Sequence, residues 1–69
     1  MHTCIRIQAA RAAFARAAWV RGQMPSYDED AIVDMLIDLR LWCRSIGADF
    51  SRCDHMAWLF LHGQEASAS

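Results

Sequence analysis

Residues 26–47, which read SYDEDAIVDMLIDLRLWCRSIG, decide the fold of this chain. Ser26 followed by Glu29 is the spacing of a capping box, in which both side chains accept hydrogen bonds from free backbone N–H groups at a helix start. Acids fill the first turn and arginines approach the last, as the helix dipole favours. Gly47 then supplies a C-terminal stop. The stretch predicts an α-helix over about residues 27–46.

Two further helices are predicted, one on each side of this stretch. Residues 3–21 are rich in alanine and other helix formers and are followed by a glycine. Residues 51–62 have two good capping candidates at their start, Asp49 and Ser51, and precede Gly63. Three helices with short connections and no strand pattern predict an all-α fold, a small three-helix bundle.

The length of 69 residues allows one domain. We predict a single helical domain over residues 1–63 and a flexible tail over residues 64–69, which are small and polar. A domain this short buries only about 60% of its unfolded surface, yet 55% of the sequence is apolar. We therefore expect a homodimer or a tightly held protein partner.

The number of cysteines and the length of the apolar runs indicate the cellular location. Three cysteines are an odd number, they lack the spacing of a disulfide framework, and no secretory signal precedes them. No apolar run approaches the roughly 20 residues that a bilayer span needs. We expect free thiols, a cytoplasmic location and no membrane partner.

Charge is segregated along the chain. Residues 1–27 hold four arginines and no acid, whereas the chain from Asp28 onward holds eight acids and three arginines. The basic segment either pairs with the acidic one or meets an external anion such as nucleic acid. Arginines spaced five apart point about 140° from one another and do not form one basic face, so nucleic-acid binding is the alternative rather than the main prediction. These residues are Arg6, Arg11, Arg16 and Arg21.

The central predicted helix carries two apolar stripes and a ridge of acids. Seven apolar residues between Ile32 and Ile46 follow three- and four-residue steps and form a core stripe. A second apolar stripe lies on another side and would need a second neighbouring helix or a partner to cover it, while the acidic ridge would pair with the arginines or bind a basic partner. The predicted partner-binding residues are Val33, Ile37 and Leu41 of the second stripe, Asp30, Asp34 and Asp38 of the ridge, and Trp58, Leu59 and His62 of the last helix.

The sequence predicts no catalytic, cofactor or metal site. Cys53 and His55 are two residues apart and would point about 200° from each other on a helix, unlike the ligand pairs of structural zinc sites. No nucleophile with a base, and no carboxylate pair in a pocket, is readable from three short helices. A helix-turn-helix with its recognition helix over residues 49–58 would present two acids and one arginine to DNA phosphates, which argues against that motif.

Residues 38–57 read DLRLWCRSIGADFSRCDHMA. This stretch resembles a group of small helical proteins encoded in GC-rich proteobacterial genomes and their mobile elements, which share a D-L-R-x-W-C-x-x-x-G-x-D-F core followed by a short helix. The group has no assigned activity. The resemblance implies a mobile-element context, in which small proteins act on larger host or phage proteins, as anti-CRISPR inhibitors do. The sequence therefore predicts a non-enzymatic helical module that acts by binding a protein partner.

Overall fold

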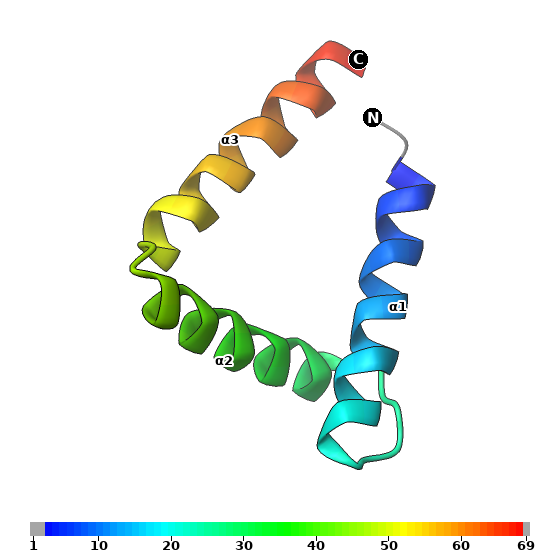
Figure 1. Ribbon diagram of the computed structural model, residues 1–69. Coiled ribbons are helices and arrows are strands. Elements are labelled where there is room, and N and C mark those ends of the chain that lie inside the picture. Colours follow the sequence, from blue (N-terminus) through cyan, green and yellow to red (C-terminus); the bar gives the residue numbers. More distant parts are fainter. Residues whose placement is uncertain (1–2, 69) are drawn as a thin grey trace. The chain divides into compact units, whose positions relative to one another are not determined.

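The structure is a computed structural model that describes the backbone of residues 3–68 and the side chains of residues 3–63. It contains three α-helices, α1 (Thr3–Arg21), α2 (Glu29–Ile46) and α3 (Phe50–Ala68), and no strand among the described residues (Figure 1). The predicted all-α fold class is confirmed, with the three helices expected of a small helical bundle. Residues 1 and 2 of the predicted domain and residue 69 of the predicted tail lie outside the described residues.

Helix α2 begins two residues later than predicted, because Asp28 is its N-cap. The backbone N–H of Ala31 donates to Asp28 Oδ1 at 3.1 Å, and the N–H of Ile32 donates to the Asp28 carbonyl oxygen at 3.2 Å. The predicted capping box of Ser26 with Glu29 is therefore wrong. Aspartate caps a helix at least as well as serine, and its carboxylate also interacts favourably with the positive end of the helix dipole.

The Asp28 cap makes a testable prediction for stability. Asp28→Ala leaves the Ala31 N–H without its side-chain acceptor and should lower the free energy of unfolding by about 1 kcal/mol. Ser26→Ala, the matched control in the same connection, should leave it unchanged. Urea unfolding followed by circular dichroism at 222 nm measures both. If Ser26→Ala lowers the free energy of unfolding more than Asp28→Ala does, Ser26 rather than Asp28 is the N-cap of α2.

The ends of α1 and α2 follow the sequence prediction. Gly22 and Gly47 have φ angles of 72° and 74°, a left-handed conformation that glycine adopts without steric cost. The N–H of Gln23 donates to the carbonyl oxygen of Ala18 at 2.9 Å. The equivalent bond after α2 runs from Ala48 to the Cys43 carbonyl at 2.8 Å. Both ends are thus closed by the glycine-based motif that satisfies the last free carbonyls of a helix.

Helix α3 has the predicted start and a different end. Asp49 caps it, because its Oδ1 accepts a hydrogen bond from the backbone N–H of Arg52 at 3.2 Å. The predicted end at His62 is wrong, since the helix continues through Gly63 to Ala68. A glycine inside a helix costs only about 1 kcal/mol relative to alanine, and the residues that follow it include glutamine, glutamate and alanine, which favour helix. That residues 64–69 are flexible stays a prediction.

The chain divides into two compact units, Met1–Asp38 and Leu39–Ser69. The first contains α1 and the first part of α2, and the second contains the last part of α2 and α3. Helix α2 is continuous across this division, so the residues that share one of its faces are fixed by the helix alone. The prediction of a single domain over residues 1–63 stays a prediction.

Few side chains are buried. Among the described side chains only Ala18 and Ala31 are fully buried, at 4% and 5% exposure. Both belong to the unit that holds α1 and the first part of α2, and small side chains are what two helices need for a close approach. Met35, predicted in the core stripe of α2, is half-buried, whereas Leu39 and Trp42 of the same stripe are exposed.

Candidate functional site

Helix α2 presents three different sides. One side contains Ala31, Met35 and Asp38, which are buried or half-buried, and we assign it to the contact with α1. About 70° further around the axis lies the apolar face of α2, centred on Leu39. The mixed face of α2 is centred on Ile37, about 160° from Leu39. The apolar face consists of Ile32, Leu36, Leu39, Cys43 and Ile46, and the mixed face of Asp30, Val33, Asp34, Ile37 and Leu41.

The three apolar residues of the mixed face are exposed. Val33, Ile37 and Leu41 each retain about half of their accessible surface, at 51%, 50% and 52%. Residues spaced four apart line one side of a helix, so the predicted second stripe exists as an exposed apolar row. Asp30 and Asp34 lie beside it and are also exposed. The mixed face is thus an apolar row flanked by carboxylates.

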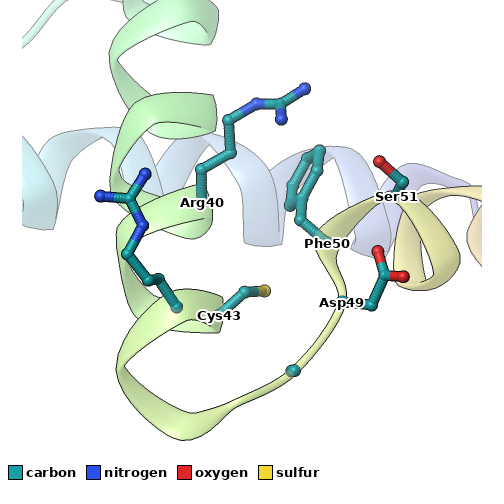
Figure 2. Close-up of a pocket in the computed structure, with 7 residues that line it drawn as sticks. Arg40, Cys43, Asp49, Phe50 and Ser51 are labelled. Carbon is teal, nitrogen blue, oxygen red and sulfur yellow. The ribbon is translucent and has the colours of Figure 1, made fainter.

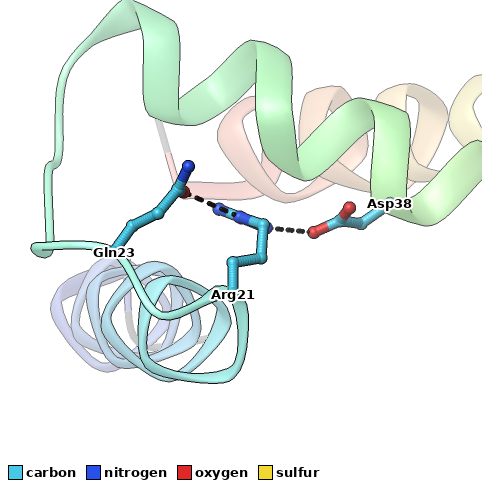
Figure 3. Close-up of polar contacts among 3 residues, drawn as sticks. All are labelled: Arg21, Gln23 and Asp38. Atoms are coloured by element: carbon cyan, nitrogen blue, oxygen red, sulfur yellow. Dashed lines mark hydrogen bonds and ion pairs between the residues drawn. The ribbon is translucent and has the colours of Figure 1, made fainter.

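The third member of the predicted acidic ridge has a different environment. Asp38 Oδ2 accepts a hydrogen bond from Nη1 of Arg21 and forms an ion pair with it. Arg21 also donates from Nε to Gln23 Oε1 at 3.2 Å, which holds the guanidinium at the end of α1 (Figure 3). The expectation of pairing between the two charged segments therefore holds at this position. Within residues 3–63, Asp30 and Asp34 have no ion pair of this kind.

The other arginines of α1 have separate surroundings. The guanidinium of Arg11 lies over the Tyr27 ring at 4.1 Å, and that of Arg16 lies over the Trp19 ring of its own helix at 4.0 Å. These are cation–π contacts, which still leave a charge accessible to solvent. Together with Arg6 and Arg21 they stay the residues of the alternative prediction, nucleic-acid binding.

Helix α3 carries an aromatic row at the position of the predicted contact residues. The rings of His55 and Trp58 are nearly parallel, with centroids 6.3 Å apart. The rings of Trp58 and His62 are tilted by 38°, with centroids 4.0 Å apart. Trp58 nevertheless remains exposed, as does Leu59. Sequence reasoning singled out Trp58 and His62 but missed His55, although the three- and four-residue spacing of the row was a readable signal.

Two open hollows lie in the unit formed by the end of α2 and the start of α3. Their volumes are about 350 and 420 Å³, and both are lined by Arg40, Phe50 and Ser51. The Arg40 guanidinium stacks on the Phe50 ring at 4.4 Å, as Figure 2 shows. Arg44 and Asp49 line the smaller hollow, so opposite charges share it. Sequence reasoning missed this arrangement, because the pairing of Arg40 with Phe50 depends on the turn between the helices.

The described residues offer no set of ligands for a metal ion, since no three of their histidine, cysteine, aspartate or glutamate side chains come together. The cysteines Cys4, Cys43 and Cys53 are free thiols, as predicted. Among the residues that the structure describes, no helix has the length and apolar character of a membrane span.

No protein-family model, curated protein or solved structure matches this chain. The resemblance of residues 38–57 to small proteins of mobile elements therefore stays a prediction.

Proposed function

We propose that the protein is a non-enzymatic helical module that binds a partner protein through the mixed face of α2. The exposed row of Val33, Ile37 and Leu41 carries this proposal. Rows of aliphatic residues at four-residue spacing are the anchors by which helices dock into apolar grooves of other proteins. Burial of the three side chains would supply most of the affinity.

The charges beside the row indicate the character of the partner. Asp30 and Asp34 lack an intrachain ion pair among the described residues, so a partner with arginines or lysines at the rim of its groove would be attracted to this face. Such rim charges mainly raise the rate of association and the specificity. We therefore propose a partner that combines an apolar groove with a basic rim.

Two further predictions belong to this proposal. Trp58, Leu59 and His62 are proposed as additional contact residues on α3, with the exposed Trp58 ring as their main anchor. The module is proposed to act as a homodimer, in the cytoplasm, in the role of a mobile-element accessory protein or an inhibitor of the anti-CRISPR type. The exposed apolar surface supports the association, and the resemblance of residues 38–57 supports the role.

A comparison of variants tests the binding face. Ile37→Asp places a charge in the middle of the apolar row and should abolish capture of the partner from a lysate of the native host. Ile5→Asp is the matched control, because Ile5 is also an exposed isoleucine and lies on α1. The captured protein is then purified, and its affinity is measured by calorimetry. Asp30→Asn with Asp34→Asn should weaken binding at low salt and have less effect at high salt. Equal capture by the two isoleucine variants would overturn the proposal.

The same preparation tests the alternative function. Retention on a DNA or RNA column that falls steeply with salt, and that is lost when Arg6 and Arg16 are replaced by glutamine, would favour nucleic-acid binding. If the protein passes through the column at low salt, nucleic-acid binding is excluded.

A further inference from the structure

We draw no further inference here: the strongest candidate, the open hollow of about 420 Å³ between the end of α2 and the start of α3, which is lined by Arg40, Phe50, Ser51, Asp54, His55 and Trp58, brings together an arginine, a carboxylate and aromatic rings, a mixture that selects no one class of ligand, and nothing in the structure shows what covers it.

Discussion

Leu39→Asp should strongly weaken the homodimer proposed above and lower its thermal stability, which is the largest effect we expect from any single surface substitution. Leu39 is exposed at the centre of the apolar face of α2, so in a symmetric homodimer built on this face one mutation removes two leucines from the interface. Burial of a leucine contributes about 1.5–3 kcal/mol, and two of them correspond to roughly a hundredfold to ten-thousandfold change in the dissociation constant.

Sedimentation equilibrium across a range of concentrations measures this change in the dissociation constant. Leu41→Asp is the control, because Leu41 is an exposed leucine of the same helix and lies on the mixed face. It should keep the proposed homodimer and lose the proposed partner, whereas Leu39→Asp should lose the homodimer. If the two variants have equal dissociation constants, the apolar face of α2 is not the interface.

Helix existence and type could be read from the sequence because the signals are local. Glycines after α1 and α2 adopt the left-handed conformation that closes a helix, and alanine-rich or amphipathic stretches form the helices between them. The start of α2 shows where such local signals are not enough. Ser26 and Asp28 are both good N-caps two residues apart, and which of them caps α2 depends on how the connection leaves α1.

The sequence could not predict which side chain each arginine of α1 contacts. Four arginines and the acidic ridge predict pairing in general, but within residues 3–63 the one ion pair between them joins Arg21 to Asp38. The reason is geometric: Arg21 is the last residue of α1, next to the connection, and Gln23 orients its guanidinium. Arg11 and Arg16 lie close to aromatic rings instead, and no spacing rule distinguishes these outcomes.

The candidate site was only half predictable for a similar reason. A helical period identifies the residues that share a face, so Val33, Ile37 and Leu41 were identified as one row. It does not identify what covers that face. The core stripe was expected to be buried within the chain, but Ile32, Leu36 and Leu39 of that stripe are exposed.

The contact between α1 and α2 depends on two small residues, which gives the second large prediction. Ala18 and Ala31 are the fully buried side chains among those described, and their size allows the two helices to approach. Ala18→Leu inserts three additional carbon atoms where almost no surface is free. Overpacking of this kind costs about 1–3 kcal/mol, which corresponds to a fall in melting temperature on the order of 10 °C for a chain this short.

Ala13→Leu is the control for this substitution, because Ala13 is exposed on the same helix and leucine and alanine have similar helix propensities. Its melting temperature should match that of the unmodified chain. Thermal unfolding followed at 222 nm compares the variants at one fixed protein concentration, because the proposed homodimer would make the melting temperature depend on concentration. If Ala18→Leu melts at the same temperature as Ala13→Leu, then α1 does not pack on α2 through Ala18. The ion pair of Arg21 with Asp38, worth at most about 1 kcal/mol at a partly exposed site, could not hold the two helices together in its place.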